Sequence, residues 1–171
     1  ELWEDLSEET ARKAVNTKGR TVVYGIWHAI RIEDITMNLL VAADDQIFEK
    51  ENWAARINAS VKHTGNSLDK KEILRFSERI DINELRVYRM AVARQSENII
   101  RRLRPEDMKR DVHQANLQRI LNEQAVDDVP SANWLIDFWG KKDVAGIILM
   151  PCLRHRLVHL NESMEAKRRK K

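Results

Sequence analysis

Apolar side chains recur every three or four residues from Arg20 to Ala42, and this period limits the fold more than any other feature of the chain. It is the period of an α-helix with a wide buried face. The face consists of Val23, Ile26, Trp27, Ile30, Ile35, Leu39 and Leu40. Gly19 and Thr21 mark the beginning of this helix. Only five glycines and three prolines occur in 171 residues, so local preference favours helix over most of the chain. The sequence therefore predicts an all-α protein.

Two more long helices are predicted from their caps. Asp81 is a good N-cap for a helix that must stop near Pro105. Asp143 is expected to cap the last long helix, which contains Pro151. Because proline lacks a backbone N–H, either this helix bends at Pro151 or a new helix starts there.

The segments between these helices are less regular. Residues 44–66 lose the helical period and are predicted to be a long connection with a short helical piece around Trp53. Short helices are predicted over residues 70–76 and 106–124. A further one is expected to begin at Ser131 as its N-cap and to end at Gly140.

The length and a 43% hydrophobic content suit one compact domain over residues 1–166, followed by a basic tail at 167–171. Five cations in this tail account for the net charge of +3. No aromatic residues alternate with them, so a solvated helix end is favoured over nucleic-acid binding. The longest uncharged stretch, residues 144–153, is too short to span a membrane. With no signal peptide and one cysteine, the protein is expected to be cytoplasmic.

His155 and His159 lie four residues apart in the closing segment. On a helix this spacing directs both imidazoles to one side, where they can bind one metal ion. Five histidines produce such a pair by chance in about one random chain in nine. The pair therefore becomes informative only with a third ligand from another element, since an open catalytic site usually has three.

His28 is the best candidate for that third ligand. It sits in the middle of the first long helix, on its apolar stripe. A core histidine bonded to a carbonyl is the alternative. His63 lies in the polar connection, where a capping role is expected, and His113 lies on a polar segment. One imidazole facing two others would make a three-nitrogen site for zinc, nickel or iron(II).

Three segments together resemble the DinB/YfiT-like family of damage-inducible metalloproteins. They are residues 24–34 (YGIWHAIRIED), 52–56 (NWAAR) and 153–162 (LRHRLVHLNE). The resemblance implies a four-helix bundle in up-down-down-up order, with a long connection between the second and third helices. It also implies a divalent metal held by His28, His155 and His159. The first helix is short for such a bundle, so we expect that upstream residues complete it or that a neighbouring chain covers the face.

Four other residues are candidates for roles near the metal. Cys152 falls on the face of His155 in a regular helix and is either a fourth ligand or a small core residue. Glu162 could orient an imidazole, act as general base on water, or pair with a cation at the surface. Tyr24 and Arg31, one turn either side of His28, could contact a substrate, and Arg31 offers a fork for a carboxylate or phosphate.

The leading functional prediction is a divalent-metal-dependent enzyme whose open coordination position activates water or a thiol. Family members suggest a thiol S-transferase or a hydrolase, with a small-molecule substrate and a low-molecular-weight thiol as cosubstrate. A homodimer is a further expectation, in which the neighbouring chain covers the face left by the short first helix. No glycine-rich phosphate loop and no serine or cysteine nucleophile constellation competes with the predicted metal-dependent enzyme. The alternative is a non-catalytic helical interaction protein in which the histidines are structural.

Overall fold

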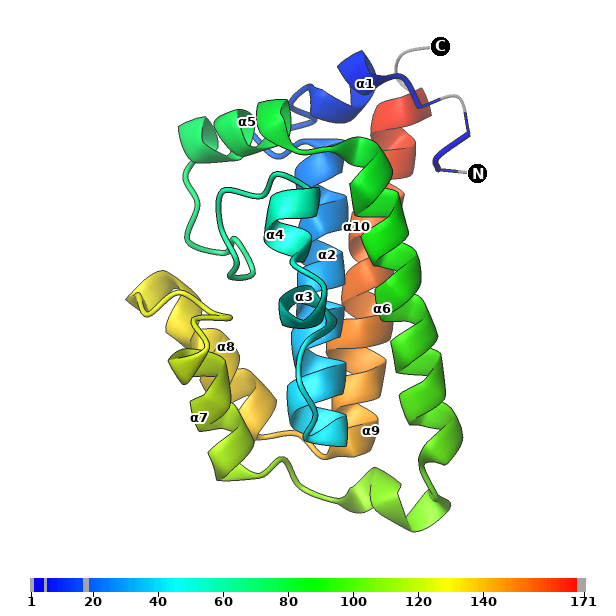
Figure 1. Ribbon diagram of the computed structural model, residues 1–171, viewed down its shortest axis with the longest axis vertical. Helices are drawn as coiled ribbons and strands as arrows, with labels where there is room; N and C mark the ends of the chain where they lie inside the picture. Colours follow the sequence, from blue (N-terminus) through cyan, green and yellow to red (C-terminus); the bar gives the residue numbers. More distant parts are fainter. Residues whose placement is uncertain (1, 5, 17–18, 169–171) are drawn as a thin grey trace.

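The computed structural model describes residues 2–4, 6–16 and 19–168 (Figure 1). Within these ranges the regular secondary structure is helical, and the only β-type pairings are isolated bridges. The predicted all-α class is confirmed. No helix in the described ranges is both long enough and apolar enough to cross a membrane.

Three long helical rods form the body of the molecule. The first is α2 (Val22–Ile35), which continues as the π-helix η1 (Thr36–Ala42). The second is α6 (Ile82–Arg102). The third consists of α9 (Val144–Ile147), the π-helix η3 (Ile148–Arg154) and α10 (His155–Arg168). In Figure 1, α2 and α6 run in the same direction and the third rod runs back.

The predicted caps begin all three rods. Thr21 accepts a hydrogen bond from the backbone N–H of Tyr24, Asp81 from that of Glu84, and Asp143 from that of Gly146. Each cap satisfies an N–H group that lacks an intrahelical partner. The sequence therefore located the start of every long helix correctly.

Pro151 lies inside the third rod without ending it. The backbone changes to a π-helix over η3 and returns to an α-helix at His155. A π-helix has wider turns, which accommodate a residue that cannot donate to the preceding turn. Neither an abrupt end nor a separate new helix occurs at this proline.

Shorter helices pack around the rods. They are α1 (Glu8–Arg12), α3 (Ile47–Lys50), α4 (Trp53–Arg56), α5 (Lys70–Arg79), the 3-10 helix η2 (Pro105–Lys109), α7 (Gln114–Asn122) and α8 (Pro130–Gly140). The predicted helical piece at Trp53 is present as α4.

Two details of the sequence prediction were wrong. The expected helix over 106–124 is divided, because residues 110–113 are extended and pair with the segment before α9 through Val112 N–H to Lys142 O and Val144 N–H to Arg110 O. Helix α8 begins two residues earlier than expected, with Val129 at the N-cap in place of Ser131 and Pro130 in the first turn. Proline suits that position because its fixed φ is helical and no N–H is needed there.

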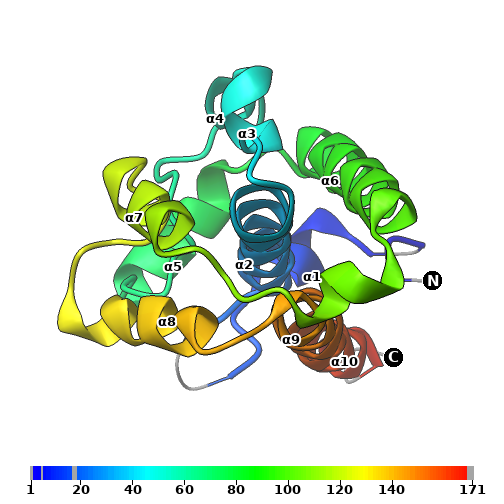
Figure 2. The ribbon, with the colours of Figure 1, turned by 90° about the horizontal axis from the view of Figure 1, so that it is seen from below.

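Helix α2 is the centre of the fold. Every residue from Val22 to Ile35 is buried. Figure 2 shows α6 and α10 on one side of α2 and α7 and α8 on the other. A helix surrounded in this way can direct side chains from its whole circumference into the interior.

The four-helix, up-down-down-up order stays a prediction. Among the described residues there are three long rods, and α1 has five residues. Lys167 and Arg168 of the predicted basic tail end α10, whereas Arg169, Lys170 and Lys171 lie outside the described residues.

Candidate metal centre

The three predicted histidines meet between α2 and α10. His28 projects from α2, and His155 and His159 project from successive turns of α10. Their ring centroids are 4.6 to 5.1 Å apart, and one nitrogen from each ring lies within 4.8 Å of the others. The juxtaposition of His28 with the i,i+4 pair is therefore as the sequence predicted.

The two α10 histidines already have the spacing of ligands on one ion. Their Nε2 atoms are 3.1 Å apart. Two nitrogens bound at about 2.0–2.1 Å to a zinc ion would be separated by roughly 3 Å. The pair therefore fits one metal with little movement.

Hydrogen bonds fix the orientation of two of the rings. His28 Nδ1 donates to the backbone carbonyl of Thr64 at 2.6 Å. His159 Nδ1 donates to Glu162 Oε2 at 3.1 Å. A carbonyl and a carboxylate only accept, so Nδ1 carries the proton in both neutral rings and Nε2 keeps its lone pair. These are the outer contacts that usually orient metal-binding histidines.

Hydrogen bonds within the protein do not satisfy every ring nitrogen of the cluster, as His155 shows. Its Nδ1 is buried and has no hydrogen-bond partner in the described part of the chain. Its Nε2 lies 3.1 Å from the Nε2 of His159, whose lone pair accepts a hydrogen bond when the proton of His155 is on Nε2. A cation bound by the three Nε2 atoms would replace this hydrogen bond, and the proton of His155 would then lie on Nδ1. The donor set therefore fits a divalent metal.

All three imidazoles have depressed pKa values. Burial lowers the pKa of His28 well below its usual range, and the two neighbouring histidines lower it further. Burial, followed by the proximity of His159 and of Arg20, lowers the pKa of His155 to about 4, and burial followed by Arg20 lowers that of His159 to about 4. At neutral pH the rings are uncharged, so a metal need not displace protons from them.

Cys152 is not part of the cluster. The donor group among the described residues comprises only the three histidines. Cys152 packs in the apolar core, with its Sγ 3.5 Å from Thr36 Oγ1. The wider turns of η3 change the register that a regular helix would have given it. Burial raises its thiol pKa to about 12, which disfavours a thiolate ligand.

Glu162 and Tyr24 both contact the cluster. The Glu162 carboxylate accepts from His159, which is the orienting arrangement considered for it. Tyr24 stacks on the His28 ring, with centroids 5.7 Å apart and planes 9° from parallel. Its hydroxyl donates to Gly65 O. Gly65 has φ of +81°, and a Cβ there would stand 3.1 Å from the tyrosine ring, so glycine lets this loop close over Tyr24.

Arg31 is not brought to the histidines. It is fully buried, and its guanidinium donates to Asp34, Tyr88, Gln46 and the carbonyl of Lys62. Asp34 in turn accepts from Tyr88, Asn38 and two backbone N–H groups. The donors that would bind a substrate carboxylate or phosphate are therefore occupied. The remaining histidines lie apart: His63 accepts from Gly65 N–H, and His113 is exposed before α7.

A pocket of about 400 Å³ opens beside the three histidines. Apolar side chains from α2, α8, η3 and α10 form most of its wall. The lining comprises Arg20, His28, Ile32, Asn66, Trp134, Leu135, Phe138, Trp139, Met150, Pro151, His155, Val158 and His159. A substrate in this pocket would reach the nitrogens of the candidate metal centre.

Arg20 and Asn66 are pocket residues that the sequence analysis did not single out. Arg20 precedes the Thr21 N-cap of α2, where the chain is not helical, so the periodicity of the His28 face does not place it at the pocket. Asn66 belongs to the loop between α4 and α5. No spacing rule links that loop to α10, so only the folded chain identifies Asn66.

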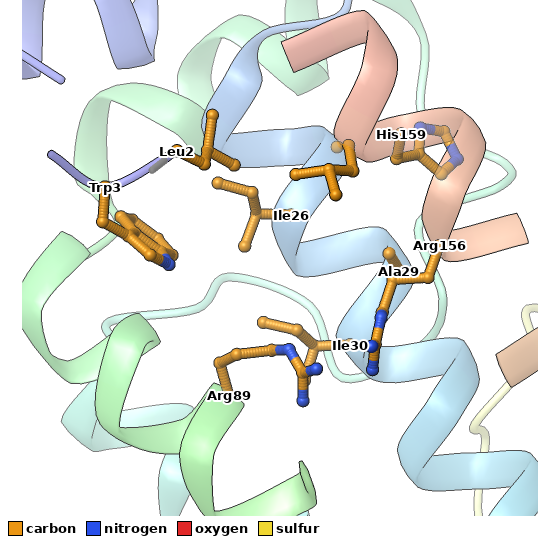
Figure 3. Close-up of a pocket in the computed structure, with 10 residues that line it drawn as sticks. Leu2, Trp3, Ile26, Ala29, Ile30, Arg89, Arg156 and His159 are labelled. Atoms are coloured by element: carbon orange, nitrogen blue, oxygen red, sulfur yellow. The ribbon is translucent and has the colours of Figure 1, made fainter. Parts of the chain in front are cut away.

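A second hollow of about 230 Å³ lies between α2, α6 and α10 (Figure 3). Leu2 and Trp3 border it at one side, and Arg89 and Arg156 approach each other across it. The buried carboxylate of Glu33 pairs with Arg156 at 3.0 Å and with Arg89 at 3.7 Å. His159 borders this hollow as well, but the other two histidines do not. The pocket that contains all three is therefore the candidate site for chemistry.

The sequence of the chain matches no family model and no curated protein.

Proposed function

We propose that the protein is a divalent-metal-dependent enzyme of the DinB/YfiT-like type, acting as a thiol S-transferase or a hydrolase. One observation carries this proposal: three neutral imidazoles converge with no fourth protein ligand in the described residues, beside a pocket of about 400 Å³. A site with three protein ligands leaves a coordination position open, which is the pattern of catalytic rather than structural metal sites. The directions of α2, α6 and α10 agree with the last three helices of an up-down-down-up bundle.

The residues around the centre have distinct roles in this proposal. His28, His155 and His159 hold a zinc, nickel or iron ion through their Nε2 atoms. The Thr64 carbonyl and the Glu162 carboxylate keep two of the rings in the metal-binding tautomer. When bound, the metal lowers the pKa of a coordinated water or thiol and so supplies a nucleophile at neutral pH. The apolar wall of Trp134, Leu135 and other side chains limits the access of bulk water.

Glu162 has a second role in this proposal. Its side chain is 40% exposed, so it can exchange protons with solvent while it contacts His159. A carboxylate in that position can take the proton that a nucleophile releases, provided the proton moves through one water.

Metal content measured by elemental analysis tests the proposal. We expect one metal per chain after equilibration with Zn²⁺ or Ni²⁺ and desalting. We expect His28→Ala to lose it, because two imidazoles on one helix remain. His63→Ala is the matched control, since His63 contacts the loop backbone and not the cluster. Stoichiometric metal in His28→Ala would contradict the site.

A turnover assay addresses the chemistry. The metal-loaded protein is incubated with a low-molecular-weight thiol and an aromatic electrophile, and with an ester or amide in place of both. We expect metal-dependent turnover in one of the two assays, and none after chelation. Metal binding without turnover of either kind would favour the alternative, a non-catalytic interaction protein.

One surface feature supports that alternative. Leu149, Leu153, Leu157 and Leu160 are 40–54% exposed on η3 and α10, spaced four, four and three residues apart. An apolar row of this kind is typical of a contact with another helix. A second copy of the chain is the simplest occupant. Sedimentation equilibrium tests it: dimerisation that Leu153→Lys weakens would support this role.

A further inference from the structure

We infer that the substrate of the candidate metal centre is an anion with an apolar, aromatic body, and that Arg20 binds its negative group. This inference rests on the proposed function, because it concerns the same pocket. It adds the chemical class of substrate, which three histidines alone do not specify.

Arg20 places a permanent positive charge at the pocket. A guanidinium remains charged at all accessible pH values and presents a planar fork that matches a carboxylate or a phosphate. No ion pair in the described ranges involves Arg20, and no side-chain hydrogen bond is formed by its guanidinium there. This differs from Arg31, whose donors all bind protein groups.

Arg20 and the three histidines line the same pocket, so the charge of Arg20 lies near the metal that the histidines would hold. A cation in this position disfavours a further positive charge, including that of the metal the histidines would hold. A bound anion would offset this repulsion, so substrate and metal would favour each other's binding.

The side chains that line the pocket indicate that the rest of the ligand is apolar. Trp134 and Phe138 lie side by side on α8 with ring centroids 6.1 Å apart. Trp134 is 52% exposed although it is a large aromatic residue. Together with Pro151 and Val158 they form an apolar part of the lining that also contains the histidines. An aromatic or compact apolar group that covers this surface would bury it from water.

Asn66 adds a polar position to the pocket. Its Oδ1 is buried and lacks a hydrogen-bond partner among the residues described. Such an acceptor is costly unless a donor reaches it. A hydroxyl or N–H group on the ligand would satisfy Asn66. The pocket therefore suits a substrate with one anionic group, one donor and one apolar body, and its volume of about 400 Å³ suits a small molecule of one or two rings.

Titration calorimetry with metal-loaded protein tests this inference. The probes are 2-naphthoate and 2-naphthyl phosphate, with 2-naphthalenemethanol as the neutral analogue. We expect both anions, or one of them, to bind about 10- to 100-fold more tightly than the alcohol, as a charge-assisted hydrogen bond would give. The two anion arms distinguish a carboxylate substrate from a phosphate.

Substitutions of Arg20 test whether this residue binds the anion. Arg20→Met should reduce anion affinity to that of the alcohol and leave alcohol binding unchanged, while Arg20→Lys should retain part of the preference. Arg75→Met is the control, because Arg75 lines a separate hollow beside α5. Unchanged anion binding in Arg20→Met would overturn the inference and would indicate that the metal alone holds the anion. Equal affinities of the wild-type chain for anion and alcohol would overturn it too.

Metal analysis of the same samples separates the two proposals. If the wild-type chain contains no metal, the proposed function fails. The comparison of wild type with Arg20→Met in the metal-free state then still decides whether Arg20 binds the anion.

Discussion

Replacing Glu162 with Gln is expected to weaken metal binding about 10-fold without removing it. The carboxylate accepts from His159 Nδ1 at 3.1 Å and so favours the tautomer whose Nε2 can bind a metal. Glutamine keeps an acceptor oxygen but lacks the negative charge. In the wild type, that charge raises the basicity of the His159 ring. Outer contacts of this kind typically change metal affinity 10- to 100-fold. The Glu162 side chain is 40% exposed, so solvent screens it and the smaller figure applies.

A competition titration against a chromophoric chelator measures this change. A 10-fold loss corresponds to about 1.4 kcal/mol. Glu97→Gln, on the exposed surface of α6 where it pairs with Arg101, is the matched control and should bind metal as the wild type does. Wild-type affinity in Glu162→Gln would refute the orienting role. A loss as large as that of His159→Ala would refute it differently, because Glu162 would then act as a ligand.

Three further outcomes follow from buried polar groups. Glu33→Gln should lower the free energy of unfolding by about 2 kcal/mol in urea titrations, because it removes the buried negative charge that pairs with Arg156 and Arg89. Asp34→Asn should cost about 3 kcal/mol or more in the same assay, since it leaves the buried Arg31 charge uncompensated, and a neutral effect would contradict the assigned network. Burial raises the Cys152 pKa from 9.0 to about 12. At pH 8, iodoacetamide should therefore modify the folded chain about 1,000-fold more slowly than the urea-unfolded chain, as mass spectrometry can measure. The free energy of unfolding should fall as pH rises above 9, because only the unfolded thiol ionises there.

Local sequence determined most of the helical structure. The period from Arg20 to Ala42 and the caps at Asp81 and Asp143 predicted the long rods, because apolar spacing and capping act within a few residues of the chain. The prediction was wrong where distant segments pair, as over residues 110–113. The extended backbone there is held by Lys142 and Val144, whose proximity no local pattern indicates.

The candidate site, too, was predicted only in part from the local sequence. The sequence by itself determined that His155 and His159 share a helix face and that His28 lies on an apolar stripe, because both follow from the period of one helix. Only the tertiary structure decided the surroundings. It brings the Thr64 carbonyl to His28, buries Arg31 in its own network and leaves Arg20 at the pocket. These contacts join residues far apart in the chain, so they depend on how the helices pack and not on the pattern within any one of them.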